Sequence, residues 1–110
     1  MDTKTPSVGS HSPWGGIDYV TEHHDGVCFV STPSHGGVFV PEKVRRLLPE
    51  KFRGQAWYEE DCEWAIPAYF LAGFFVGGPN FGDDIEDVRA EARGVLERWY
   101  PEVLAEEVGV

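Results

Sequence analysis

The chain has 110 residues and a mass of 12.3 kDa, which leaves little room for a second hydrophobic core and predicts a single domain. Hydrophobic residues make up 42% of the sequence and aromatic residues 14%, so the chain carries enough apolar surface to fold and is not intrinsically disordered. Nineteen acidic residues against nine basic ones give a formal net charge of -10, which disfavours direct binding to nucleic-acid phosphates.

The start of the chain is polar and lacks the apolar stretch of a secretion signal. We therefore expect a flexible N-terminal arm over residues 1–13 and a single domain over residues 14–110. The longest apolar run, residues 65–78, is too short for a membrane span of roughly 20 residues. These features predict a cytoplasmic protein, in which Cys28 and Cys62 are free thiols.

Three β-strands are predicted in the first half of the chain. Residues 17–22 are rich in β-branched and aromatic side chains, and Asp25-Gly26 is a strong hairpin signal. Residues 27–32 are nearly all apolar, as in a central strand that is covered on both faces. A turn over residues 33–37 leads into a third strand over residues 38–40. The sequence thus predicts a three-stranded antiparallel meander.

Helices are predicted to follow these strands. Pro41 suits the first turn of a helix over residues 42–48, which Pro49 ends. Residues 59–64 are predicted to begin a second helix, which Pro67 interrupts or kinks because proline lacks the backbone N–H of a helix interior.

The clearest predicted element is a helix from Asp83 to Tyr100. Asp83 and Glu86 match the spacing of a capping box, so Asp83 is the expected N-cap. A short terminal helix is expected over residues 102–108. The long helix has an apolar stripe that should pack inward: Ile85, Val88, Ala92, Val95, Leu96 and Trp99.

Together these elements predict an α+β fold, in which a three-stranded antiparallel sheet packs against C-terminal helices in a single compact domain. Large aromatic side chains bury the most apolar area per residue, so we expect them to supply most of the core. The residues concerned are Trp14, Phe29, Trp57, Trp64, Phe70 and Phe74.

Enzyme chemistry is weakly indicated. The sequence lacks the usual metal-ligand spacings, which leaves only a composite metal site of His35 with Glu60 or Asp61. A cysteine nucleophile with His35 as its base is the other option, but four carboxylates around Cys62 disfavour its thiolate, and Cys28 lies within a predicted strand. No catalytic residue, metal or cofactor is therefore predicted, and a small metal-dependent or Cys/His hydrolase stays an alternative hypothesis.

Two further patterns predict no site. The glycine-rich segments over residues 34–37 and 77–82 match no phosphate-binding motif and are interpreted as turns. A group of basic residues is interpreted as a solvated face: Lys43, Arg45, Arg46, Lys51 and Arg53.

The acidic residues are unevenly distributed. Residues 1–58 hold six acids and six bases, whereas residues 59–110 hold thirteen acids and three arginines and so carry the whole excess. On a helix, carboxylates three and four positions apart lie close enough together to imitate successive phosphates of a nucleic acid. We therefore predict a partner-binding surface of Glu59, Glu60, Asp61, Glu63, Asp83, Asp84, Glu86, Asp87 and Glu91.

Three segments resemble a known family: residues 31–40 (STPSHGGVFV), residues 57–64 (WYEEDCEW) and the ending Trp99-Tyr100-Pro101. Between Pro13 and about Pro101, the chain is similar to an uncharacterised domain family of short proteins from phages and other mobile elements. No chemistry is assigned to that family, so its motif residues give candidate sites only. These are His35, Glu59, Glu60, Asp61 and Cys62.

In size and acidity the chain is also similar to small anti-CRISPR inhibitors, several of which act as DNA mimics against type I surveillance complexes. This resemblance implies a bacterial cytoplasm and a protein partner with a basic nucleic-acid-binding surface. The leading hypothesis is thus a non-enzymatic inhibitor that acts as an acidic DNA mimic and binds no nucleic acid or membrane itself. The alternatives are the hydrolase centred on His35 and an accessory protein of a mobile element.

Overall fold

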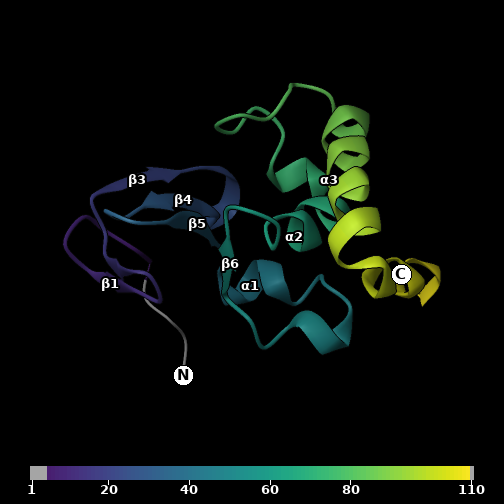
Figure 1. Cartoon of the computed structure of the whole chain (residues 1–110), viewed down its shortest axis with the longest axis horizontal. Helices are drawn as coiled ribbons and strands as arrows, with labels where there is room; N and C mark the ends of the chain where they lie inside the picture. Colours follow the sequence, from purple (N-terminus) through teal and green to yellow (C-terminus); the bar gives the residue numbers. More distant parts are fainter. Residues whose placement is uncertain (1–4, 110) are drawn as a thin grey trace.

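The larger sheet of the molecule has four antiparallel strands. The computed structural model describes residues 5–109 and, among them, the side chains of residues 5–105. The strands lie in the order β3-β4-β5-β6, so the sheet is a meander that follows the chain (Figure 1). They span Tyr19–Glu22 (β3), Cys28–Ser31 (β4), Gly36–Phe39 (β5) and Trp57–Glu59 (β6).

The helices lie on one side of this sheet, and the two longest α-helices, α2 and α3, pack against each other (Figure 1). With a radius of gyration of 13.2 Å, the chain is as compact as one domain of its length should be. The helical segments are η1 (His24–Gly26), α1 (Glu42–Arg45), η2 (Glu50–Phe52), α2 (Ala65–Phe70), η3 (Ala72–Phe74), α3 (Ile85–Trp99) and η4 (Pro101–Gly109).

The α+β class is confirmed, but the predicted three-stranded sheet is wrong in its number of strands: the main sheet has four strands, and a separate sheet has two. Asp25 and Gly26 both have positive φ, 54° and 88°, which reverses the chain between β3 and β4 as the hairpin signal predicts. β6 was not predicted, because three residues give no periodic signal. Its register pairs Tyr58 with Val38 of β5, and both side chains are buried.

The predicted helix over residues 59–64 is wrong. Glu59 ends β6, residues 60–64 form turns, and the helix begins only at Ala65. Pro67 is the third residue of α2, where a backbone N–H has no partner within the helix, so proline neither interrupts nor kinks it. The helix expected over residues 42–48 is also shorter, since α1 ends at Arg45 and a turn follows.

The long helix is confirmed as α3, with a corrected N-cap. Asp84, rather than Asp83, precedes the first helical residue with extended backbone angles. Its Oδ1 accepts a hydrogen bond from the backbone N–H of Glu86 at 3.2 Å, which satisfies one of the unpaired donors of the first turn. The expected terminal helix is present as the 3-10 helix η4.

The apolar stripe of α3 is buried only in its middle. Val88, Ala92 and Leu96 are fully buried, whereas Ile85 and Trp99 at the two ends are 42% and 56% exposed. A helix of 15 residues is about 22 Å long, so α3 extends past the layer that it covers at both ends.

Each face of the sheet is buried by a different part of the chain. Side chains alternate along a strand, so Phe29 and Val38 lie on the face that α2 and α3 cover. Val30 and Phe39 lie on the opposite face, together with Ile17 from the segment before β3. The apolar sequence of β4 is thus explained by burial on both faces, as predicted.

A two-stranded hairpin covers that opposite face. Its strands are β1 (His11–Ser12) and β2 (Gly15–Gly16), and the Trp14 ring of its turn packs against Trp57 of β6 with ring centroids 5.8 Å apart. β1 lies inside residues 1–13, the segment predicted to be a flexible arm, of which residues 1–4 lie outside the described part of the chain.

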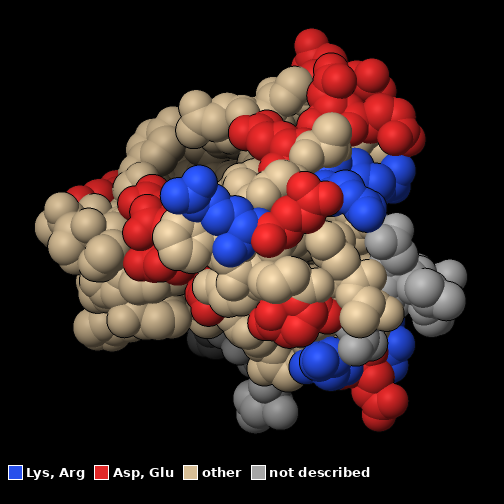
Figure 2. All heavy atoms as spheres, turned by 45° about the vertical axis from the view of Figure 1, so that its right-hand side comes forward, with Lys and Arg blue, Asp and Glu red and all other residues tan. Residues whose placement is uncertain are grey.

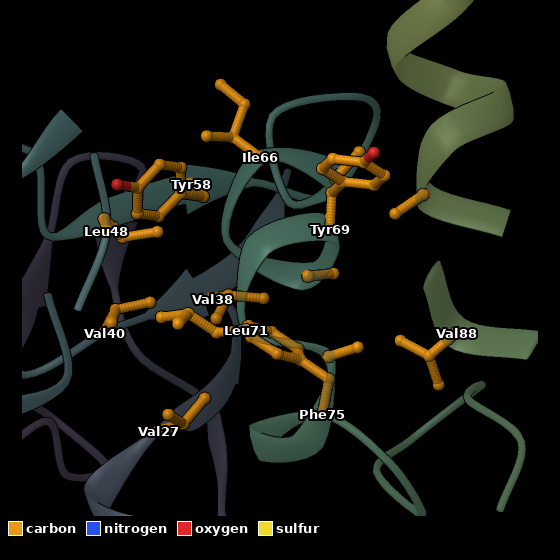
Figure 3. Close-up of a cluster of buried hydrophobic side chains, with 14 of the residues drawn as sticks. Val27, Val38, Val40, Leu48, Tyr58, Ile66, Tyr69, Leu71, Phe75 and Val88 are labelled. Carbon is orange, nitrogen blue, oxygen red and sulfur yellow. The ribbon is translucent and has the colours of Figure 1, made fainter. Parts of the chain in front are cut away.

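The main core lies between the sheet and the helices. Figure 3 shows Val38 on the sheet side, Phe75 beyond it and Val88 reaching in from α3. The largest fully buried side chains are Tyr58, Phe39, Phe75, Leu48 and Leu96. The six aromatic residues expected to supply most of the core are only half-buried and pack around it, because large rings at the edge of a small domain keep one side in water.

Candidate functional site

Acidic side chains gather at the start of α3. Asp83, Asp84, Glu86 and Asp87 are all exposed, and we call these four residues the acidic end. Figure 2 shows Asp and Glu concentrated over this part of the helix, whereas Lys and Arg lie among the acids farther along the same face. The strongest negative potential of this face is therefore expected at the acidic end.

Local helix chemistry explains why acids collect there. The N-terminal end of a helix carries unpaired N–H groups and a partial positive charge, which stabilise neighbouring carboxylates. The acidic end is only partly neutralised from within the helix. Arg89 lies 3.1 Å from Glu86, but both side chains are exposed to water, where such a pair contributes at most about 1 kcal/mol.

A cleft of about 300 Å³ opens beside α3, visible as a recess in Figure 2. Strands β3, β4 and β5 form one side of the cleft. Its walls are partly aromatic, since Tyr19 of β3, Phe29 of β4, Trp64 and Phe81 line it. Glu60 of the turn after β6 and Glu91 of α3 also line it. The cleft therefore brings together one residue from each of the two predicted acidic groups.

One wall of the cleft is the loop over residues 77–82. Phe81 packs against Trp64 and Phe29, with ring centroids 5.4 and 6.0 Å apart. Asn80 has a φ of 69°, a conformation that asparagine adopts more readily than most residues, and it turns the chain just before Phe81. The glycine-rich segment read as a turn from the sequence is thus a turn that also shapes the cleft.

Two of the nine predicted binding residues are half-buried and hold the turn after β6 through contacts inside the protein. Glu59 is half-buried, and its Oε2 lies 3.4 Å from Nδ1 of His35. Glu63 is half-buried too, and its Oε1 accepts a hydrogen bond from the backbone N–H of Glu59 at 3.0 Å. Asp61 is exposed in the same turn. Glu59 and Glu63 therefore order the turn, and we leave them out of the candidate contact surface.

The structure pairs His35 with Glu59 rather than with either acid predicted for a composite site. Among the described residues, no group of three or more His, Cys, Asp and Glu side chains is placed to hold a metal ion. Cys28 is buried, and burial followed by the charge of Glu22 raises the pKa of its thiol to about 11, so at neutral pH it is protonated. Cys62 is half-buried and free.

The basic residues of the first half support the fold locally. Arg45 donates to the carbonyl oxygen of Val40 at 2.9 Å, and Arg53 donates to that of Leu48 at 2.8 Å. These bonds hold α1 and η2, which lie away from the start of α3 (Figure 1). The guanidinium groups of these arginines thus contribute to local structure at the other end of the molecule.

Sequence reasoning missed the aromatic lining of the cleft. Phe29 and Trp64 were assigned to the core, and Tyr19 and Phe81 were given no role. One signal was available in β3, where Tyr19 and Thr21 are two residues apart and so lie on one face of the strand. Tyr19 is 63% exposed, which shows that the helices leave this edge of the face uncovered.

Comparison with known proteins identifies the family. A family model described as a domain of unknown function (DUF7007) matches residues 7–109, so the chain belongs to this family. No curated protein and no solved structure shows a significant match to the chain. Within residues 5–109, none of the helices combines the length and the apolar character that crossing a membrane requires.

Proposed function

We propose that this DUF7007 protein is a non-enzymatic, anti-CRISPR-like inhibitor that acts as an acidic DNA mimic. Its partner is the basic nucleic-acid-binding surface of a bacterial type I defence complex. The observation that carries the proposal is the acidic end, where four exposed carboxylates precede or occupy the first turn of one helix. Glu60 and Glu91 extend the negative charge to the cleft.

The physical basis is electrostatic complementarity. A protein channel that holds DNA is lined with lysine and arginine. A carboxylate surface of matching shape attracts these positive side chains as the DNA phosphates do. A folded helix presents its carboxylates at fixed spacing, so little ordering entropy is lost on binding. Complementary fields also speed association, and salt screens them, so inhibition should weaken as ionic strength rises.

The test is competition for DNA. A type I surveillance complex is incubated with labelled target duplex and increasing amounts of the protein, and bound DNA is followed by electrophoretic mobility shift. We expect the wild-type chain to displace the duplex. The acidic-end variant, Asp83→Asn with Asp84→Asn and Asp87→Asn, should displace it at least about tenfold less effectively, since asparagine keeps the N-cap but removes the charges.

The matched control variant removes the same number of charges elsewhere: Asp18→Asn, Glu42→Gln and Glu50→Gln, all at exposed positions. It should compete like the wild type. If both variants lose the same amount of DNA displacement, net charge alone explains the effect. If the acidic-end variant competes as well as the wild type, mimicry by this surface is refuted.

The His35–Glu59 pair favours one competing function, a small hydrolase. A carboxylate next to Nδ1 can orient an imidazole so that its other nitrogen acts as a base or binds a metal. Elemental analysis of the purified protein, together with His35→Ala, tests it. Stoichiometric metal and a hydrolytic activity that disappears in His35→Ala would favour the enzyme over the inhibitor. An accessory role in a mobile element predicts neither DNA displacement nor hydrolysis.

A further inference from the structure

The cleft combines negative charge with aromatic walls. Glu60 and Glu91, both exposed, come from different elements and line the same space of about 300 Å³. Trp64 and Phe81 line it too, with their rings at an interplanar angle of 72°, and Tyr19 adds a third ring that is 63% exposed. No lysine or arginine is among the described residues that line it.

These groups select a cationic ligand with an apolar stem. The two carboxylates attract positive charge and repel phosphates, which excludes a nucleotide. Aromatic faces attract a cation through their negative π-surface and also pack against methylene groups. A guanidinium group is favoured over an ammonium group, because it is planar, stacks on aromatic rings and offers several donors to separate carboxylates.

We propose that the cleft is a binding site for one arginine side chain presented by a protein partner. The inference rests on the proposed function, since a basic nucleic-acid-binding surface is where a partner exposes arginines. The acidic end lies at the start of α3, and Glu91 follows Asp87 by about one turn of the same helix, so one basic surface reaches both features. The acidic end then supplies long-range attraction. The cleft fixes the position of the partner relative to this protein, because it encloses a single arginine side chain.

A titration with a minimal arginine probe tests the site. Nitrogen-15-labelled protein is titrated with N-acetyl-arginine N-methylamide and, separately, with the matching citrulline compound, which has the same shape and no charge. We expect millimolar affinity for arginine, with amide shifts at Thr21, Ser31 and Asn80 and at the indole of Trp64, and no such shifts with citrulline.

Two variants keep the test specific. Glu60→Gln with Glu91→Gln should weaken arginine binding at least about fivefold, because both carboxylates are lost from the cleft. Glu42→Gln with Glu50→Gln, which changes two exposed acids outside the cleft, should leave binding unchanged. Absence of saturable shifts up to about 50 mM arginine probe, equal shifts with citrulline, or shifts mapped to the acidic end alone would overturn the proposal.

The titration contains no defence complex, so its outcome is separate from that of DNA competition. Arginine binding without DNA displacement would retain the cleft and reject the proposed inhibitor. Displacement without arginine binding would retain the inhibitor and reject the cleft as the contact that fixes the position of the partner.

Discussion

Nε2 of His23 lies 2.8 Å from the carbonyl oxygen of Val76. A carbonyl oxygen only accepts, so Nε2 carries the proton in this hydrogen bond. His23 follows β3, and Val76 precedes the loop over residues 77–82, so the bond connects the edge of the sheet to a wall of the cleft. The His23 ring also packs against Phe29, with centroids 5.9 Å apart, which places it between the sheet and the loop.

Removing this bond should loosen the loop without unfolding the domain. In His23→Ala, we expect the amides of Gly78 and Phe81 to exchange with deuterium about fivefold faster, because a lost partly buried hydrogen bond costs on the order of 1 kcal/mol. Amides in the middle of α3 should be unchanged. The control is His11→Ala, which changes an exposed histidine of β1. Equal exchange in wild type and His23→Ala would show that the bond does not hold the loop.

Gly37 is required by the ring that lies on it. A Cβ at this position of β5 would overlap the Trp14 indole and the Tyr58 carbonyl oxygen. Gly37→Ala should therefore lower the free energy of unfolding by about 1 to 3 kcal/mol, measured by urea denaturation. Gly54→Ala is the control, because a Cβ there meets no atom within 4 Å. A loss of similar size in both variants would contradict the packing of Trp14 on β5.

Asp84, the N-cap of α3, should contribute to the stability of the fold. Asp84→Ala should lower the free energy of unfolding by about 1 kcal/mol, since the Glu86 N–H loses its acceptor, whereas Asp84→Asn should change it little. Asp83→Ala, one residue earlier, should cost less than half as much as Asp84→Ala. Thermal or urea unfolding of the three variants checks this, and a larger loss at Asp83 would restore the N-cap predicted from the sequence.

The buried thiol of Cys28 should make stability fall at high pH. Its pKa is about 11 in the folded chain against an ordinary value of 9.0, first because of burial and second because of Glu22. The folded state keeps the proton that the unfolded state releases, so stability is full below pH 9 and is lost between pH 9 and about 11.

The comparison is with Cys28→Ser, which does not titrate in this range. The stability of wild type relative to Cys28→Ser should fall by about 1.4 kcal/mol per pH unit over that window, measured by urea unfolding. The pKa of Tyr58 is also raised, chiefly by burial. Tyr58 is present in both chains, so its contribution cancels in the difference between their free energies of unfolding. A difference that stays constant with pH would show that Cys28 titrates normally in the fold.

Much of the fold follows from local sequence signals. The positive φ of Asp25 and Gly26, the two-sided burial of β4 and the spacing of Val88, Ala92 and Leu96 all correspond to patterns within a few residues. β6 could not be predicted in this way. Its three residues are fixed by pairing with β5 across an intervening segment of 17 residues, and such long-range pairing leaves no periodic signal.

In the candidate site, too, the features set by local sequence could be predicted, and those set by long-range packing could not. The acidic end could be predicted, because helix N-termini favour acids and the helix itself has a clear period. The meeting of Glu60 and Glu91 at one cleft could not, since it depends on how the turn after β6 packs beside α3. Likewise, the internal roles of Glu59 and Glu63 depend on partners that sequence spacing does not reveal.

The most direct test of the account is the affinity of the protein for a type I surveillance complex that holds no target DNA. Isothermal titration calorimetry would compare the wild type, the acidic-end variant and the matched control variant at one ionic strength. We predict that the wild type and the control bind with dissociation constants within about twofold, and that the acidic-end variant binds at least about tenfold more weakly. Equal affinity of all three chains, or no binding by the wild type, would contradict the claim that the acidic end occupies the partner's nucleic-acid-binding surface.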